Sequence, residues 1–350
     1  MVGGGGSGVV MVLVLTEFLE QGLSTMSKVA MSRGMSNFVF VAYSNALAIF
    51  FLFSASLFFY RKRRLPALTL SIAFRIFLMG LIATCLQLLM YVGIGYSSPT
   101  LASVMTDLAP AFTFILALIS RMEKIDLRVQ SSMAKIVGTI VCITGALIVT
   151  LYRGLPLTNG SPSMPQGLLL QPHSSWIIGG FLLGCAAFLL SVLLIVQTWI
   201  LRDYPAELML TLLTCVVVTI QSTIVALIME KDVNAWMLKP DVELMTIVYS
   251  AFFVVAIRSV THAWVCKTKG PVYISMFKPL GMIIASAMGV SLLGDTLYLG
   301  SVIGGVIIAI GFYAVIWGKA EEEKAVQESG SFSFKSSSPK VPLLNKPVEA

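Results

Sequence analysis

Charged residues are scarce in this sequence, and several motifs that drive catalysis are missing from it. Asp, Glu, Lys and Arg make up only 12% of the chain, about half of their share in a soluble domain. The absence of GxxxxGK[ST] excludes an ATP-driven pump with a phosphate loop. HExxH and GxSxG are absent too, and His173 and His262 are too few for a histidine-based metalloenzyme. The sequence therefore predicts a protein that is not an enzyme and uses no metal or cofactor.

The cysteines are also too few and too scattered to organise the chain. No pair has the spacing of metal ligands, and disulfides are not expected within apolar segments. We interpret them as small apolar packing residues. They lie inside or at the edge of apolar blocks, at Cys85, Cys142, Cys185, Cys215 and Cys266.

What the sequence does contain is apolar residues, which make up 57% of the chain. They come in blocks of roughly 20 residues, the length that crosses a 30 Å hydrocarbon core as a helix. We expect an all-α integral membrane protein with ten transmembrane helices. The expected spans are 9–26, 37–59, 70–92, 100–120, 133–152, 176–198, 207–229, 242–264, 272–293 and 299–317.

A long connection rich in Pro, Gly and Ser divides these blocks into two groups of five. We expect a first five-helix repeat over 9–152, a non-cytosolic linker over 153–175 and a second five-helix repeat over 176–319. A flexible tail over 1–8 precedes them, and 320–350, rich in Ser, Lys and Glu, is expected to be a disordered cytosolic tail. The linker holds a glycosylation sequon at Asn159, although Pro162 would hinder its modification.

An internal repeat supports the same division. The stretch 96–154 has a weaker copy at 270–319, with prolines, acids and glycines in matching order. We expect the acids at helix ends to cap turns, and the glycines, Gly305 included, to allow close helix packing. The matching pairs are Pro99 with Pro271, Glu123 with Asp295, Gly138 with Gly304 and Gly145 with Gly311.

The basic residues predict the orientation. They concentrate in the connections on one side of ten spans, which the positive-inside rule makes the cytosolic side, so that both termini are cytosolic. The net charge of +7 therefore needs no nucleic-acid partner. Because five spans per half is an odd number, the two five-helix repeats are inverted relative to one another, as in transporters that open alternately to each side.

Two ionisable residues in the duplicated spans are the first candidates for a substrate site. Asp107 lies in the expected span 100–120 and Lys278 in 272–293, at similar distances from their leading prolines. Pro110 and Pro279 lie close by and would free backbone carbonyls. A zwitterion could place its carboxylate on Lys278 and its ammonium on Asp107. The alternative is a structural Asp–Lys pair that neutralises itself.

Other polar groups in the spans are secondary candidates. Glu17 and Glu20 share a helical face; they could couple transport to protons, as Asp107 could, or mark a first span that starts late. Arg258 and His262 could bind an anion or relay a proton, but we favour Arg258 snorkelling toward the cytosol. Arg75 is expected to snorkel too. The neutral candidates are Gln87, Asn45, Gln197 and Gln221.

Three stretches resemble a plant transporter family. They read YSSPTLASVMTDLAPAFTFILALISRME, AKIVGTIVCITGALIVTLYRG and KGPVYISMFKPLGMIIASAMGVSLLGDTLYLGSVIGGVIIAIGFYAVIWGKAEE. The sequence is similar through nearly all of 10–320 to the "walls are thin"-related, nodulin-21-like transporters, also called usually-multiple-acids-move-in-and-out transporters. These belong to the EamA branch of the drug/metabolite transporter superfamily. The resemblance implies two inverted five-helix repeats that move amino acids, or in some members auxin, across the plasma membrane or tonoplast.

We therefore expect a secondary transporter of amino acids in the lipid bilayer, a facilitator or proton-linked exporter, with the plasma membrane favoured over the tonoplast. Asp107, Lys278, Pro110, Pro279, Gln87 and Arg258 are the expected substrate-binding residues, and Glu17 and Asp107 the expected proton-coupling residues. The rival predictions are a transporter of auxin or another small organic acid and a membrane receptor or scaffold without transport. A homo-oligomer remains open.

Overall fold

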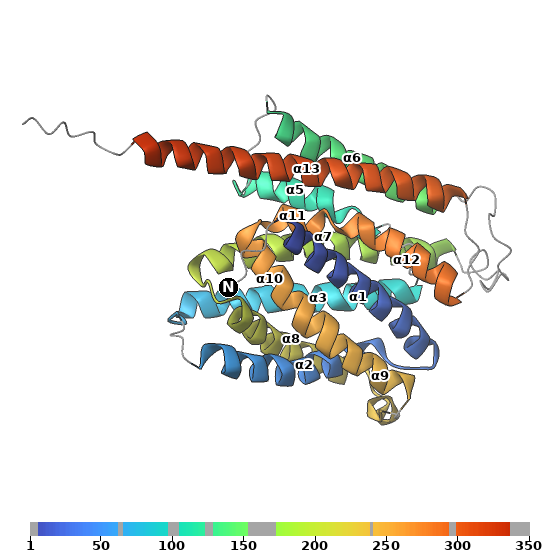
Figure 1. Ribbon diagram of the computed structural model, residues 1–350. Coiled ribbons are helices and arrows are strands. Elements are labelled where there is room, and N and C mark those ends of the chain that lie inside the picture. The colour runs from blue at the N-terminus through green and yellow to red at the C-terminus, as the bar shows by residue number, and fades with distance from the viewer. Residues whose placement is uncertain are drawn as a thin grey trace, which may run out of the picture.

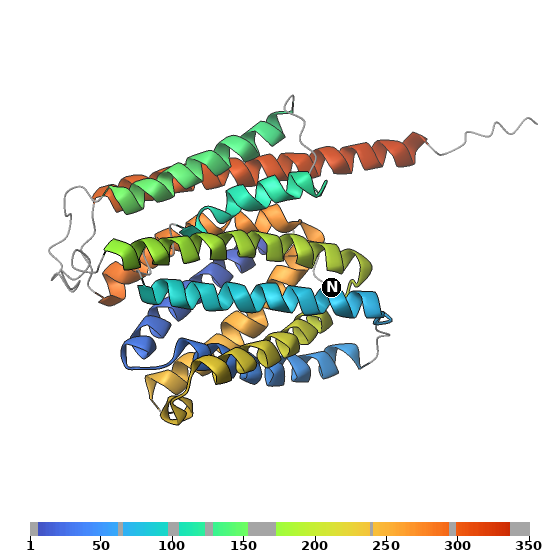
Figure 2. The ribbon, with the colours of Figure 1, turned by 180° about the vertical axis from the view of Figure 1, so that it is seen from behind.

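The structure, a computed structural model, describes residues 6–61, 66–96, 105–122, 129–152, 173–238, 241–293 and 299–336. Within these ranges every regular element is a helix (Figures 1 and 2). Glu123, Asp295, Pro99 and Asn159 lie outside the described residues. The helices are α1 (Gly6–Ser32), α2 (Asn37–Tyr60), α3 (Leu70–Tyr96), α5 (Ala109–Ile119), α6 (Gln130–Leu151), α7 (His173–Asp203), α8 (Glu207–Met229), η2 (Val233–Trp236), α9 (Val242–Tyr249), η3 (Ser250–Arg258), α10 (Ser259–Thr268), α11 (Pro271–Ser275), α12 (Lys278–Leu293) and α13 (Leu299–Ser336).

These helices confirm the all-α membrane fold. The ten expected spans are α1, α2, α3, α5, α6, α7, α8, the continuous run α9–η3–α10, the pair α11–α12, and α13. Five described segments are long and apolar enough to cross a membrane, and three shorter helices are also apolar. The five are Asn37–Tyr60, Leu70–Ile94, Ile178–Asp203, Glu207–Met229 and Val242–Thr268.

The packing of the helices follows the inverted repeat. In the repeat, α1, α2 and α3 correspond to α7, α8 and α9–α10, while α5 and α6 correspond to α11–α12 and α13. Equivalent helices α2 and α8 pack against each other, as do α6 and α13. The contact of α3 with α7 has its counterpart in α1 against α9 and η3, and that of α5 with α7 in α1 against α12. Such paired contacts are what two halves related by a pseudo-two-fold axis produce.

Both copies of the proline-containing span are interrupted at the same point. A turn at Asp107 and Leu108 precedes α5, and a turn at Met276 and Phe277 separates α11 from α12. Each new helix has proline as its second residue, Pro110 in α5 and Pro279 in α12. Proline suits this position because the missing N–H would have no intrahelical partner there. The structure thus places two helix N-termini within the bundle.

The helices α6 and α13 form a close pair with α5 on one side of the bundle, visible from front and back (Figures 1 and 2). A Cβ atom on Gly138 would lie 2.7 Å from the carbonyl oxygen of Gly311, and one on Gly145 would lie 2.9 Å from that of Gly304. Small residues allow such backbone contact between membrane helices. Gly305 is different, because no atom of the described residues lies within 4 Å of its Cβ position. The packing prediction therefore holds for four of the five glycines and is wrong for Gly305.

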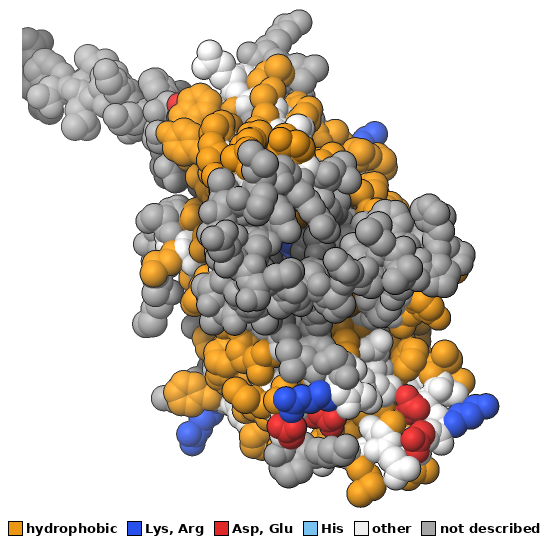
Figure 3. Space-filling view, turned by 90° about the vertical axis from the view of Figure 1, so that its right-hand side faces the viewer, with side chains coloured by type: hydrophobic (Ala, Val, Ile, Leu, Met, Phe, Trp, Pro, Cys, Tyr) orange, Lys and Arg blue, Asp and Glu red, His pale blue; other side chains and the backbone are white. Residues whose placement is uncertain are grey.

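The disorder expected over 320–350 does not hold for its first half. The helix α13 continues to Ser336 and extends beyond the bundle (Figure 1). Its continuation, AEEEKAVQES, is rich in strong helix formers, which explains why a polar segment prolongs an apolar helix. On the face shown in Figure 3, hydrophobic side chains cover much of the described surface, and acidic and basic ones gather near one end.

Candidate functional site

A cavity of about 260 Å³ lies between the two repeats. Its lining comes from α1, α2 and α3 of the first repeat and from α7, α8, η3 and α10 of the second. Just over half of the lining side chains are apolar, and the remaining polar ones converge on the space, as in sites for small ligands. Among its described lining residues, Glu20 is the only acid and Arg258 the only lysine or arginine.

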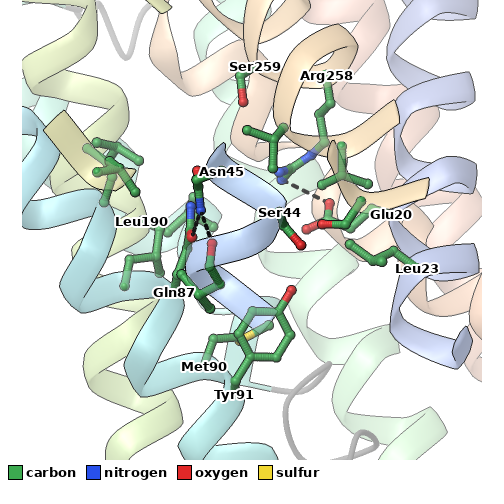
Figure 4. Close-up of a pocket in the computed structure, with 18 of the residues that line it drawn as sticks. Glu20, Leu23, Ser44, Asn45, Gln87, Met90, Tyr91, Leu190, Arg258 and Ser259 are labelled. Atoms are coloured by element: carbon green, nitrogen blue, oxygen red, sulfur yellow. Dashed lines mark hydrogen bonds and ion pairs between the residues drawn. The ribbon is translucent and has the colours of Figure 1, made fainter. Parts of the chain in front are cut away.

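Arg258 and Glu20 form an ion pair at the cavity wall. The Arg258 Nη2 atom lies 2.9 Å from Glu20 Oε2, and the two side chains are only 15% and 26% exposed (Figure 4). Arg258 is the last residue of η3, a π-helical segment within the run α9–α10. A π-helix is rare and is frequent at functional sites, because its wider turn changes the direction in which later side chains point. This segment brings Arg258 to the cavity, and the snorkelling prediction for it is wrong.

Lys278 joins the same cluster from α12. Its Nζ atom lies 2.9 Å from Glu17 Oε1 and 2.6 Å from Glu20 Oε2. The Lys278 and Glu17 side chains are 3% and 1% exposed. Gly281 allows the approach of α12 to α1, since a Cβ atom there would lie 3.2 Å from Glu17 Oε2. The result is a charge cluster of two acids and two bases, Glu17, Glu20, Lys278 and Arg258, that joins α1 to the second repeat.

Neutral hydrogen-bonding groups occupy the other side of the cavity. The Asn45 side chain donates through Nδ2 to Gln87 Oε1 at 2.9 Å and to the Val41 carbonyl at 2.8 Å. Figure 4 shows this amide pair facing the pair of Arg258 and Glu20, with Ser44 between them. The cavity therefore has a charged side and an amide side.

Three buried polar atoms around the cavity have no hydrogen-bond partner among the described residues. They are Ser44 Oγ, Arg258 Nε and His262 Nε2, all on residues that line the cavity. Buried polar atoms in native proteins are nearly always hydrogen-bonded, so such orphans call for an explanation. A polar ligand in the cavity would supply the missing partners.

The structure does not pair Asp107 with Lys278. Asp107 lies in the turn before α5, is 3% exposed and leaves Oδ2 without a hydrogen-bond partner among the described residues. It is within electrostatic reach of Glu17 and Lys278, but its neighbour Thr106, and not Asp107 itself, lines the cavity. The reason is that Asp107 lies within the helix interruption, whereas Lys278 is the first residue of the helix that follows the equivalent one.

Of the remaining predicted residues, some line the cavity and others are buried away from it. Gln87 and Arg258 line it, while Glu17, Pro110 and Pro279 are buried behind it. Because α1 already begins at Gly6, the late start offered as an alternative for Glu17 and Glu20 is wrong. Arg75 lies at the surface, 43% exposed, and pairs with Asp203 at 2.5 Å.

Some lining residues were not predicted as a group. Ser44, Tyr91 and Ser259 line the cavity, but isolated Ser and Tyr residues in apolar spans give no signal that separates them from packing residues. Their convergence depends on helix rotation, which the sequence does not specify. Within the described ranges, no group of three or more His, Cys, Asp or Glu could hold a metal ion.

Comparison with known proteins agrees with this geometry. The model of the EamA-like transporter family matches residues 7–151, which is the first repeat. Two WAT1-related proteins of Arabidopsis thaliana are each 46% identical to this chain; one match covers 89% of this chain and 86% of the relative, the other 91% and 90%. The chain belongs to the WAT1-related, EamA-like transporter family. It is therefore an integral membrane transporter.

A solved structure shows the same fold at a much greater distance. It has a TM-score of 0.66 and 13% sequence identity, over 91% of this chain and 99% of its own. At this identity the likeness concerns the fold alone. The fold of this WAT1-related transporter is thus shared by a chain with little common sequence.

Proposed function

We propose that this transporter moves amino acids by alternating access, with the cavity between the repeats as its substrate site. The observation that carries the proposal is the single pair of opposite charges, Arg258 and Glu20, in a cavity whose lining is otherwise neutral and largely apolar. A site between inverted repeats can open to either side when one repeat rocks against the other.

The polar groups of the cavity match those of a zwitterion. A carboxylate would find the Arg258 guanidinium, whose planar fork suits two carboxylate oxygens, and an ammonium group would find Glu20. The amide pair of Asn45 and Gln87 offers hydrogen bonds to a side chain. Since both charged partners lie in a mostly apolar wall, neutral amino acids are the expected class.

Lys278, Glu17 and Asp107 have a supporting role in this proposal. Lys278 holds Glu20 and Glu17 together at the boundary between the repeats. Movement of one repeat against the other must alter these contacts, so the charge cluster is suited to couple occupancy to rocking. Glu17 and Asp107 are the proposed proton carriers, because both are nearly fully buried carboxyl groups, Glu17 within the charge cluster and Asp107 near it.

A small organic acid such as auxin is the second candidate substrate. One arginine suffices for a monocarboxylate, and Leu23, Met79, Leu86 and Met90 provide an apolar wall for its body. The amino-acid proposal is preferred because Glu20 would then gain a substrate ammonium, whereas an acid without an ammonium group leaves Glu20 without that compensation. The plasma membrane is the proposed location, with the tonoplast as the alternative.

The test is efflux from oocytes that express the full chain. Cells are preloaded with a labelled panel of amino acids and with indole-3-acetate, and efflux is measured at two external pH values. We expect efflux of several neutral amino acids above that of uninjected cells. A pH effect would support coupling through a buried carboxyl group.

The other outcomes separate the rivals. Efflux of indole-3-acetate alone would replace the amino-acid proposal with the organic-acid one. No efflux from cells whose surface protein is verified by biotinylation would contradict both proposals. Arg258→Gln is the matched variant, and it should abolish the efflux of every carboxylate that the parent protein carries.

A further inference from the structure

Glu20 is the unusual member of the charge cluster, because a single one of its oxygens contacts two cations. Glu20 Oε2 lies 2.9 Å from Arg258 Nη2 and 2.6 Å from Lys278 Nζ. Lys278 also contacts Glu17, whereas Glu20 is the only acid that pairs with Arg258 among the described residues. If Glu20 leaves Arg258, it therefore keeps a cationic partner, but Arg258 loses its own.

Arg258 also has a hydrogen-bond donor that is not used by any described residue. Its Nε atom is buried and has no partner among the described residues, although the guanidinium can hold a carboxylate with two parallel hydrogen bonds. Among the described residues, Glu20 contacts the guanidinium only at Nη2. Arg258 is thus held by an internal carboxylate in a geometry that leaves a buried donor open.

We propose that Glu20 is a built-in competitor for the substrate carboxylate, contacting both Arg258 and Lys278 before substrate binds and keeping only Lys278 when a substrate carboxylate binds to Arg258. The inference deepens the proposed function, on which it rests, by assigning Arg258 as the carboxylate site and Glu20 as its exchangeable occupant. Binding then exchanges one ion pair for another, so that neither Glu20 nor Arg258 is left buried without an opposite charge.

The exchange makes a prediction about charge balance. The charge cluster holds two acids and two bases, so a monocarboxylate adds an uncompensated negative charge, whereas an amino acid brings its own positive charge. In the wild type, an amino acid should therefore bind more tightly than the same molecule without its amino group. Removing the Glu20 charge should cancel the weaker binding of the molecule that lacks the amino group.

The experiment measures ligand binding to the purified full-length protein in detergent, at one pH, by isothermal titration calorimetry. The probes are leucine, 4-methylpentanoate, which lacks the amino group, and leucinamide, which lacks the carboxylate. Glu20→Gln should tighten binding of 4-methylpentanoate by about tenfold, the size of one charge-assisted hydrogen bond. It should weaken binding of leucinamide, because Glu20 is the proposed partner of the ammonium group.

Glu17→Gln is the matched control. It removes the same charge from the same helix and also frees one contact of Lys278, but among the described residues Arg258 pairs with Glu20 and not with Glu17. Its effect on 4-methylpentanoate should be less than a third of that of Glu20→Gln. Equal tightening by both variants would show a general charge effect and would overturn the inference, as would unchanged or weaker binding in Glu20→Gln.

The design separates the inference from the function. If the wild type does not bind leucine but Glu20→Gln binds 4-methylpentanoate more tightly than the wild type does, the inference stands and the amino-acid proposal fails. If no probe binds to either protein, both fail. Should Glu20→Gln not fold, Glu20→Asp retains the charge for Lys278 on a shorter side chain, and the same direction of change is expected.

Discussion

Two regions of this transporter join the repeats in opposite ways. The α6–α13 pair holds them by backbone contact at glycines, with Gly138 against Gly311 and Gly145 against Gly304. The charge cluster of Glu17, Glu20, Lys278 and Arg258 holds them through side chains that carry four buried or half-buried charges. The first contact has no alternative arrangement, because any shift opens a gap or makes a clash. The second can exchange partners.

This difference indicates that the two contacts have different roles in transport. The cavity is lined by α1–α3, α7, α8, η3 and α10 but not by the described residues of α6 or α13. The glycine contact lies outside the cavity and is suited to be a fixed axis between the repeats. The charge cluster lies at the cavity wall and is suited to change during transport. The predictions below test this contrast, beginning with the largest expected effect.

Removing Lys278 should destabilise the protein most. Lys278→Met leaves Glu17, which is 1% exposed, without a cation among the described residues, while Glu20 keeps Arg258. Loss of one partner of a buried pair costs about 3–5 kcal/mol. We expect a lower thermal unfolding midpoint in detergent and loss of transport. Adding Glu17→Gln to Lys278→Met should recover more stability than adding Glu20→Gln; the reverse order would mean that the pairing is different.

Substitution in the glycine contact should have a smaller but purely structural effect. Gly311→Ala would place a methyl group 2.7 Å from the Gly138 carbonyl oxygen and 2.8 Å from the Cys142 backbone nitrogen. Overpacking costs about 1–3 kcal/mol. The unfolding midpoint should fall while the KM of the protein that remains folded is unchanged. Gly305→Ala is the control on the same helix, and it should be neutral or stabilising because alanine favours helix and no described residue lies within 4 Å of its Cβ position. A changed KM in Gly311→Ala would contradict a fixed axis.

At the amide side of the cavity, in contrast, substitution is expected to change the KM. Asn45→Ala removes the hydrogen bond to Gln87 at 2.9 Å and one bond to the Val41 carbonyl. A hydrogen bond contributes about 1 kcal/mol, so KM should rise roughly fivefold for substrates with polar side chains and change little for leucine. Initial efflux rates over a range of internal concentrations measure this. Equal effects on both substrates would mean that Asn45 supports the fold and does not contact substrate.

The sequence predicted the glycine contact far better than the charge cluster. Spans and their order follow from apolar length, and the glycines predict close helix packing because only small residues permit backbone contact. That α6 and α13 form the pair was not predicted. The pairing of Lys278 depends on where α1 crosses α12 and on which side of the helix interruption each charge falls. Asp107 and Lys278 looked equivalent by their distance from a proline, but Asp107 lies within its interruption and Lys278 begins the helix after its own.

The π-helical segment explains a second difference. Arg258 lies near the end of its span, a position from which arginine usually reaches the surface. The segment SAFFVVAIR is an ordinary apolar helix sequence, and no residue in it predicts that η3 is a π-helix and not an α-helix. The segment η3 packs against α1 and α2, and this packing is tertiary information that the sequence does not give. Sequence patterns therefore indicated how far along its span Arg258 lies, but not the direction in which its side chain points.

The smallest effect is expected for the ion pair of Arg75 and Asp203. It joins α3 to the end of α7, but its side chains are 43% and 54% exposed, so water screens the interaction. Such surface pairs contribute about 0–1 kcal/mol. Arg75→Ala should therefore shift the unfolding midpoint far less than Lys278→Met, although both remove a cation that joins the two repeats. Added salt should weaken the Arg75 contribution and leave that of Lys278 largely intact, since only exposed charges are well screened. If the two variants were equally destabilised, burial would not be what separates the charge cluster from an ordinary surface contact.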